Sequence, residues 1–193
     1  GGIGADTLDG GDGNDTYVVD NIGDVIIDSS GSDTVRSTLD YILADGIEDL
    51  VLLGLNRIDG MGNGANNALT GNSSDNVLDG LAGTDILTGG RGDDNFVASD
   101  HAQSVDSITD FVSGEDMILI DALAYDLFDT TTLTGYTQGT VDTSSFGTIT
   151  NGVQDNVEAL FVYDSDRNML TVDADGSGAG VAVDVFDFSG TSE

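Results

Sequence analysis

Aspartate returns at a fixed interval near the start of the chain. Residues 1–36 align without a gap in rows of nine: GGIGADTLD, GGDGNDTYV, VDNIGDVII and DSSGSDTVR. Residues 62–97 form a second array: GNGANNALT, GNSSDNVLD, GLAGTDILT and GGRGDDNFV. The sixth position of the eight rows is Asp6, Asp15, Asp24, Asp33, Asn67, Asn76, Asp85 and Asp94. Carboxylate and amide oxygens beside tight turns are ligands that Ca²⁺ prefers. The spacing therefore predicts a series of calcium sites.

Glycine recurs at the first, second and fourth positions of the rows. Glycine tolerates left-handed backbone angles, so carbonyl oxygens of the turn can face one point without obstruction by a Cβ atom. We expect such carbonyls to complete the coordination shell, which needs about six to eight oxygens. The glycines assigned to the sites are Gly2, Gly4, Gly11, Gly13, Gly83 and Gly92.

The eighth position of every row is apolar or aromatic, which predicts a short strand with one inward side chain per row. Two rows then make one flattened coil, and each row stacks on the row two places later. The expected partners are Asp6 with Asp24, Asp15 with Asp33, Asn67 with Asp85, and Asn76 with Asp94. Sites with an Asn should bind more weakly or fill later. The alternative, ordinary β-turns in a meander, predicts variable spacing, which the constant period contradicts.

These rows resemble the calcium-binding nonapeptide of RTX (repeats-in-toxin) proteins. The resemblance implies an all-β fold: a right-handed parallel β-roll with several bound Ca²⁺ ions and a C-terminal capping β region. It also implies secretion through a type I channel, with folding outside the cell where calcium is abundant.

Residues 37–61 interrupt the period between the arrays. The apolar segments Tyr41 to Leu43 and Leu50 to Leu53 predict strands that continue the roll with longer loops, and Ile58 returns the chain to register. The segment Ile47 to Gly54 resembles an RTX spacer. An independent loop insertion is the alternative.

Residues 98–193 follow the second array. Asp106-Ser107-Ile108-Thr109-Asp110-Phe111 and Gly114-Glu115-Asp116-Met117-Ile118 resemble the motif that closes many RTX rolls. We expect Asp106 and Asp110 to donate carboxylates to a last site that Asp100 can join, while Ile108 covers the final coil. An ordinary amphipathic edge strand is the alternative.

Residues 121–163 predict short antiparallel strands packed on the end of the roll. The later segment around Asp173 and Asp175 resembles the terminal block of the family and predicts one more ion, although the spacing fails the EF-hand pattern. A solvated hairpin is the alternative. Gly1 begins inside a repeat, so we expect the chain to be a fragment, and the resemblance to RTX proteins implies that it is the carboxyl-terminal part of a larger secreted protein.

Acidic residues dominate the composition. Thirty-six Asp and Glu stand against four Arg and no Lys, giving a net charge of −32, and all but four of the acids are Asp. The 38 % apolar content supports only a modest core, so folding should follow ion binding. The same charge disfavours nucleic acid and anionic membranes as direct ligands. No apolar run reaches the roughly 20 residues of a membrane span, there is no Cys, and a monomer is expected.

The chain shows no catalytic constellation, and its single histidine, His101, is expected on a polar surface. The preferred hypothesis is a calcium-dependent folding and type I secretion module of a surface adhesin, whose upstream domains contact a cell-surface or host ligand. The rival from the enzyme class is the tail of a secreted serralysin-type protease, lipase or polysaccharide-modifying enzyme. An ice- or carbohydrate-binding surface requires regular outward Thr ranks, which Val25, Val77 and Ile86 interrupt.

Overall fold

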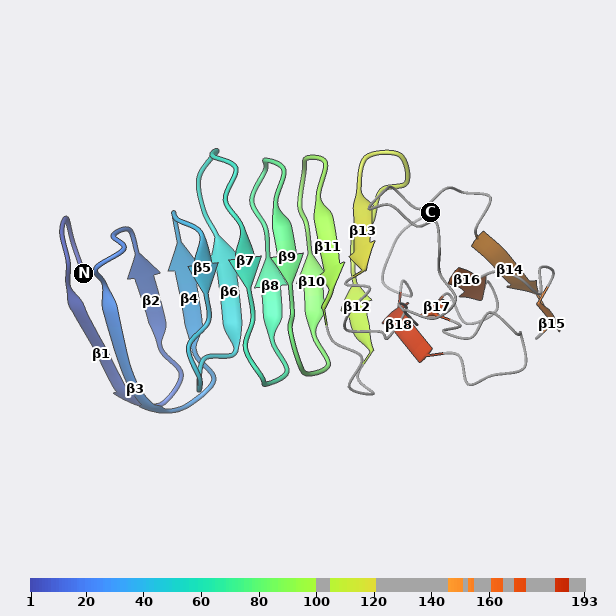
Figure 1. The fold of residues 1–193 in the computed structure, drawn as a ribbon. Coiled ribbons are helices and arrows are strands. Elements are labelled where there is room, and N and C mark those ends of the chain that lie inside the picture. The colour runs from blue at the N-terminus through green and yellow to red at the C-terminus, as the bar shows by residue number, and fades with distance from the viewer. Residues whose placement is uncertain are drawn as a thin grey trace, which may run out of the picture.

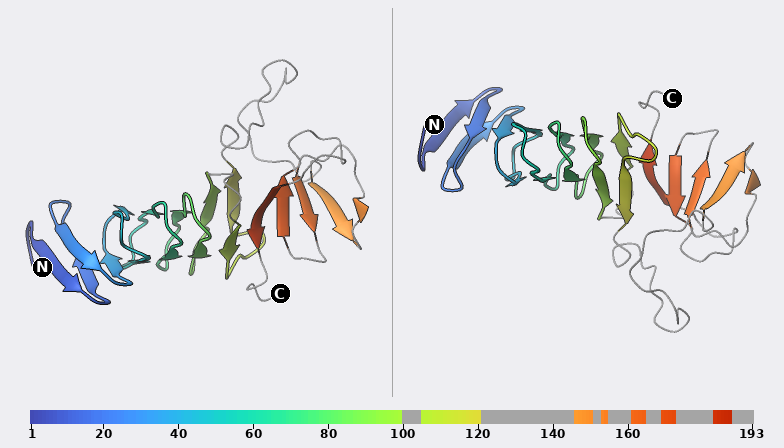
Figure 2. Two further views of the ribbon diagram at one scale, coloured as in Figure 1. Left: turned by 90° about the horizontal axis from the view of Figure 1, so that it is seen from below. Right: turned by 90° about the horizontal axis from the view of Figure 1, so that it is seen from above.

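The computed structural model describes residues 1–99, 105–120, 146–150, 153–154, 161–164, 169–172 and 183–187. Every regular element in these residues is a β-strand, and the strands follow one another along an elongated roll (Figures 1 and 2). The described part of the chain holds no helix with the length and apolar character of a membrane span.

The roll has two faces because successive strands alternate between them. One face holds the even-numbered strands β2 (Thr16–Val19), β4 (Thr34–Ser37), β6 (Asp49–Leu52), β8 (Ala68–Thr70), β10 (Ile86–Thr88) and β12 (Asp106–Ile108). The other face holds β5 (Tyr41–Ile42), β7 (Gly60–Met61), β9 (Val77–Asp79), β11 (Asn95–Ala98) and β13 (Met117–Ile120). The first two odd-numbered strands, β1 (Thr7–Asp12) and β3 (Val25–Ser30), form a separate pair.

All pairs between neighbouring coils of the roll are parallel. In the arrays the register is one full coil of 18 residues, as in the pairs Tyr17 with Val35 and Leu69 with Leu87. Each row therefore stacks on the row two places later. The predicted all-β parallel roll is confirmed.

The core is a single stripe made by the eighth position of each row. Val35, Leu78, Leu87 and Phe96 have no exposed surface. Leu8, Tyr17 and Leu69 are also buried. The exception is Ile26, which is only half-buried. Its row lacks the turn glycine and has the fully exposed Ile22 in that place. One apolar side chain per row makes a thin core, so the turns must contribute to holding the coils together.

Residues 37–61 place β5, β6 and β7 in the two faces of the roll. Val35 pairs with Leu50, and Leu50 pairs with Leu69, so the separations are 15 and 19 residues instead of 18. Ile47 and Ile58 are buried in the same core. Loops of different length therefore still return the apolar residues to the common stripe.

The strands after the second array extend the even-numbered face. β12 pairs with β10, and its other edge pairs in parallel with β18 (Val183–Asp187). Beyond β18 come β17 (Met169–Val172), β16 (Phe161–Asp164), β14 (Phe146–Thr150) and β15 (Val153–Gln154), in that order (Figure 1).

The expectation of short antiparallel strands in residues 121–163 is confirmed for β14 with β15 and is wrong for β14 with β16. The pairs β14–β15, β16–β17 and β17–β18 are antiparallel, but β14–β16 is parallel. Phe186 is fully buried and joins the core cluster that contains Ile108. The capping region therefore continues the sheet at its edge and shares the core of the roll.

Candidate metal centres

Position-six side chains lie in two ladders along the edges of the roll. In each predicted pair, the carboxylate of the later row accepts a hydrogen bond from the position-six backbone N–H of the earlier row. The donor and acceptor pairs are Asp6 to Asp24 (3.0 Å), Asp15 to Asp33 (2.8 Å), Asn67 to Asp85 (2.7 Å) and Asn76 to Asp94 (2.8 Å). The structure thus brings together all four pairs that the period of nine predicts.

These carboxylates are buried, so their negative charge is unfavourable unless a positive charge lies nearby. Asp33 and Asp85 have no exposed surface, and Asp94 is 1 % exposed. The second oxygens, Oδ2, of Asp6, Asp15 and Asp33 are buried and accept no hydrogen bond. A buried charged oxygen without a donor is strongly unfavourable, and a bound cation removes that penalty. The donor set, hard anionic oxygens in turns, fits Ca²⁺.

The pKa values of two position-six acids are shifted in opposite directions. Burial raises the pKa of Asp94 from 3.8 to about 6, opposed by the hydrogen bond from the Asn76 backbone and reinforced by nearby carboxylates such as Asp116. At Asp24 the hydrogen bond from the Asp6 backbone holds the pKa below its usual value. Backbone donors therefore stabilise the charged form at one position, while burial among acids outweighs them at another.

Glycine in the turns of the second array meets two structural requirements. Gly83 and Gly92 have φ values of 131° and 124°, and a Cβ atom on Gly83 would clash with the Ala65 carbonyl oxygen. The second array thus needs glycine for both backbone angle and close stacking.

In the first array the space beside the glycines differs from row to row, and a Cβ atom on Gly31 would clash with the Gly13 carbonyl oxygen. Gly4, Gly11 and Gly13 have positive φ values, but a Cβ atom on them would meet nothing within 4 Å. Gly2 shows neither a positive φ nor a close neighbour. The backbone angle alone favours glycine at Gly4, Gly11 and Gly13, and neither requirement applies at Gly2.

The two asparagine positions use their amides on the backbone. The Asn67 Oδ1 atom accepts a hydrogen bond from Asn63 N (2.8 Å), and its Nδ2 atom donates to the carbonyls of Ile47 and Glu48. Asn76 accepts from Asn72 N in the same way (2.8 Å). A cation near these amides must displace existing contacts, which is a physical reason to expect weaker binding there.

Two acids of the closing motif accept hydrogen bonds from backbone N–H groups of the preceding coil. Asp106 Oδ1 accepts a hydrogen bond from Asp85 N at 2.9 Å, so the predicted Asp106 extends a ladder by one row. Asp110 accepts hydrogen bonds from the N–H groups of Gly89 and Gly90. The other predicted ligands, Asp100, Asp173 and Asp175, lie outside the described residues, as does His101.

Two ladder members were not among the predicted ligands. Glu48 Oε2 accepts a hydrogen bond from Asp33 N (2.8 Å), and Asp116 Oδ1 accepts one from Asp94 N (2.9 Å). Both residues belong to the segments compared above with the RTX spacer and closing motif. The broken period hid their equivalence to position six.

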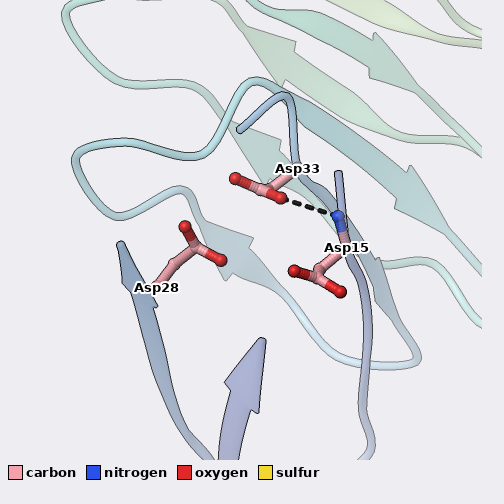
Figure 3. A group of neighbouring side chains, drawn as sticks. All are labelled: Asp15, Asp28 and Asp33. Carbon is pink, nitrogen blue, oxygen red and sulfur yellow. Dashed lines mark hydrogen bonds between the residues drawn. The ribbon is translucent and has the colours of Figure 1, made fainter. Parts of the chain in front are cut away.

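A third missed acid, Asp28, stands at position one of its row, where the first two rows have glycine. One carboxylate oxygen from each of Asp15, Asp28 and Asp33 lies within 4.8 Å of the other two (Figure 3). The Tyr17 hydroxyl donates a hydrogen bond to Asp28, and this bond raises the pKa of Tyr17 above its usual range. The acid in place of a glycine was the available signal in the sequence.

Comparison with known proteins identifies the repeats. The family model for the RTX calcium-binding nonapeptide repeat matches residues 1–21 and 61–96, in four copies. A comparison with curated proteins gives no match. The matched residues include all position-six side chains of the second array and those of the first two rows of the first array, but not Asp24 and Asp33.

Proposed function

Because residues 1–21 and 61–96 belong to the RTX calcium-binding nonapeptide repeat family, whose repeats bind Ca²⁺, we propose that the chain is a calcium-dependent folding module of a type I secreted protein. The proposed ligands are the position-six side chains of both arrays together with Asp106 and Asp110 and the carbonyls of the glycine turns. Calcium holds neighbouring coils together through these groups.

The observation that carries this proposal is the set of buried carboxylate oxygens without hydrogen-bond donors. Asp33 is the clearest case, because it has no exposed surface and only one of its oxygens accepts a hydrogen bond. With four Arg against 36 acids, the chain cannot neutralise its own carboxylates. Divalent cations between coils supply the missing charge, so a chain in low calcium stays unfolded and competent for export.

We assign the module to an extracellular surface adhesin. The support is the elongated shape of the roll, whose coils stack along one direction (Figure 2). Coils joined by ions at each turn give a stiff spacer, which suits a protein that must extend from a cell surface. Extracellular calcium is high enough for ligand sets of the weak, millimolar class.

Circular dichroism with titrated calcium tests the folding claim. In chelator we expect a disordered spectrum, followed by a cooperative gain of β signal at calcium concentrations on the order of 1 mM. Magnesium should not replace calcium, because its smaller octahedral shell at about 2.0–2.1 Å accepts irregular carbonyl-rich loops poorly. A chain fully folded in chelator contradicts the proposal.

Asp33→Asn and Asp45→Asn provide a matched pair for the same titration. Both remove one negative charge, but Asp33 is buried in the ladder and Asp45 is exposed. We expect the calcium midpoint to rise for the Asp33 variant and to stay near wild type for the Asp45 variant. Equal midpoints in the two variants would mean that general charge repulsion, and not ligation, governs folding.

A further inference from the structure

The fourth row departs from the repeat by adding an acid, Asp28, which lies in strand β3. Asp28 occupies the first position, where the first two rows have Gly1 and Gly10 and all rows of the second array have glycine. Its carboxylate is half-buried and lies near the ladder pair Asp15 and Asp33 (Figure 3). Within the described residues, this is the one group of three acids with ligand atoms so close together.

The geometry of the three carboxylates suits one ion. Two oxygens bound to the same Ca²⁺ at about 2.4 Å from it are at most about 4.8 Å apart. One oxygen from each of Asp15, Asp28 and Asp33 meets that limit with respect to the other two. The shorter bonds of Mg²⁺, about 2.0–2.1 Å, require closer oxygens in octahedral order.

A second observation points to a ligand in this group. Asp33 has no exposed surface, and its Oδ2 atom has no hydrogen-bond partner, while its Oδ1 atom accepts the bond from Asp15 N. Asp15 also has a buried Oδ2 atom without a donor. Within the described residues, none of the three acids forms an ion pair with an arginine. A bound cation would therefore balance their charge.

We propose that Asp15, Asp28 and Asp33 form a three-carboxylate site for a hard cation, which takes Ca²⁺ before the position-six pairs of the second array. This site rests on the proposed calcium-dependent function. It adds Asp28, which lies outside the repeat pattern, to the ligands of that function. Affinity in oxygen sites rises with the number of charged ligands. The pairs Asn67–Asp85 and Asn76–Asp94 each contribute one carboxylate and one amide.

Tyr17 provides a reporter beside this site, while Tyr41 lies near Asp24 of another ladder pair. The Tyr17 hydroxyl donates to Asp28, so the ring lies beside the proposed ion. Tb³⁺ is close to Ca²⁺ in size, shares its preference for oxygen ligands, and emits when a neighbouring phenol transfers excitation to it. The chain has five Tyr and no Trp, so sensitised emission reports only on ions near a tyrosine.

The experiment is a Tb³⁺ titration of the full chain with excitation of tyrosine. The variants are Asp28→Asn, Tyr17→Phe and the control Asp9→Asn, which removes an exposed acid from the same array. Equilibrium dialysis measures the number of bound ions, and circular dichroism in excess calcium shows whether each variant folds.

In wild type and in the Asp9 control, we expect the first equivalent of Tb³⁺ to give most of the emission, with displacement by Ca²⁺ but not by Mg²⁺. Asp28→Asn should weaken that first phase at least about tenfold, as removal of one charged ligand requires. Tyr17→Phe should lose the emission of this first phase and keep the number of bound ions.

An Asp28→Asn titration identical to that of Asp9→Asn overturns the site. Emission of the first equivalent retained in Tyr17→Phe also overturns it, because the first ion then lies near another tyrosine such as Tyr41, which is close to Asp24. This result decides the matter even if Asp28→Asn does not fold. A different result would contradict the proposed calcium-dependent folding. In that case the wild-type chain is already folded in chelator, whatever the Tb³⁺ result.

Discussion

Replacing Asp94 by asparagine should have opposite effects on stability with and without calcium. Asp94 is 1 % exposed, and its Oδ1 atom accepts a hydrogen bond from Asn76 N. An amide keeps the size of the side chain and an oxygen for that bond but removes the charge. The variant therefore separates the role of the carboxylate as cation ligand from its role as hydrogen-bond acceptor.

The magnitude in calcium follows from linkage. With a site of about 1 mM dissociation constant and about 10 mM calcium, binding stabilises the fold by about 1.4 kcal/mol. A tenfold weaker site at the same calcium concentration contributes about 0.4 kcal/mol, so the variant should lose about 1 kcal/mol. Urea unfolding in 10 mM calcium, about ten times the assumed constant, measures this loss.

In chelator the sign should reverse. Burial raises the pKa of Asp94 to about 6, which means that the charged carboxylate destabilises the roll when no cation is bound. A neutral amide removes this penalty, which amounts to at most about 3 kcal/mol for a shift of this size. The assay is the β signal recovered by an excluded osmolyte such as trimethylamine N-oxide in chelator, where the variant should fold at a lower osmolyte concentration than wild type.

Asp93→Asn is the matched control, since Asp93 is the exposed neighbour and loses the same charge. Its effects should stay within about 0.5 kcal/mol in both conditions. A loss of equal size with and without calcium in Asp94→Asn would show that Asp94 is only a hydrogen-bond acceptor. Identical behaviour of the two variants would refute the ligand assignment.

Three further outcomes are expected. Asn76→Asp should destabilise the chain in chelator, because it adds a carboxylate opposite Asp94 and removes the amide donor to the Ile58 carbonyl. The same added carboxylate should lower the calcium midpoint. Unchanged calcium dependence would contradict the pairing of Asn76 with Asp94. Gly83→Ala should cost about 2 kcal/mol or more in saturating calcium, as measured by urea unfolding, while the open Gly64→Ala should change little. In chelator, acidification from neutral pH to about pH 5 should increase the β signal. The pKa of Asp94 is about 6 in the folded state and 3.8 in the unfolded state, so the folded state binds more protons in that window. In calcium the gain should vanish, since protons and calcium compete for the carboxylate, and a β signal that falls on acidification in chelator would contradict the buried charge.

Much of the roll could be predicted from the period alone. A constant row of nine fixes both the apolar residue that points inward and the residue that lies above it one coil later. For this reason the pairs Asp15 with Asp33 and Asn76 with Asp94 followed from counting, and their 18-residue separation is found in the structure.

The parts that could not be predicted lie where the period breaks. Glu48 stands 15 residues after Asp33, and Asp116 stands 22 residues after Asp94, so counting in steps of 18 misses both. Loop lengths there are free to vary because only the backbone ladder and the buried stripe must return to register. The parallel joining of β18 to β12 depends on a contact between segments far apart in the sequence, which local alternation of apolar residues does not encode.

The direction of the ladder explains how separate turns can act together. In each ladder pair the later carboxylate accepts the N–H group of the earlier row, as Asp33 does from Asp15 and Glu48 does from Asp33. Asp33, Asp85 and Asp94 thus each orient the backbone of the preceding coil, while an acid of the next coil holds their own backbone N–H. Asp33 shows both contacts, and its remaining oxygen is the buried one without a donor. A cation at that oxygen therefore stabilises the two interfaces that meet at Asp33, which is the physical basis for expecting cooperative folding from a core with one apolar residue per row.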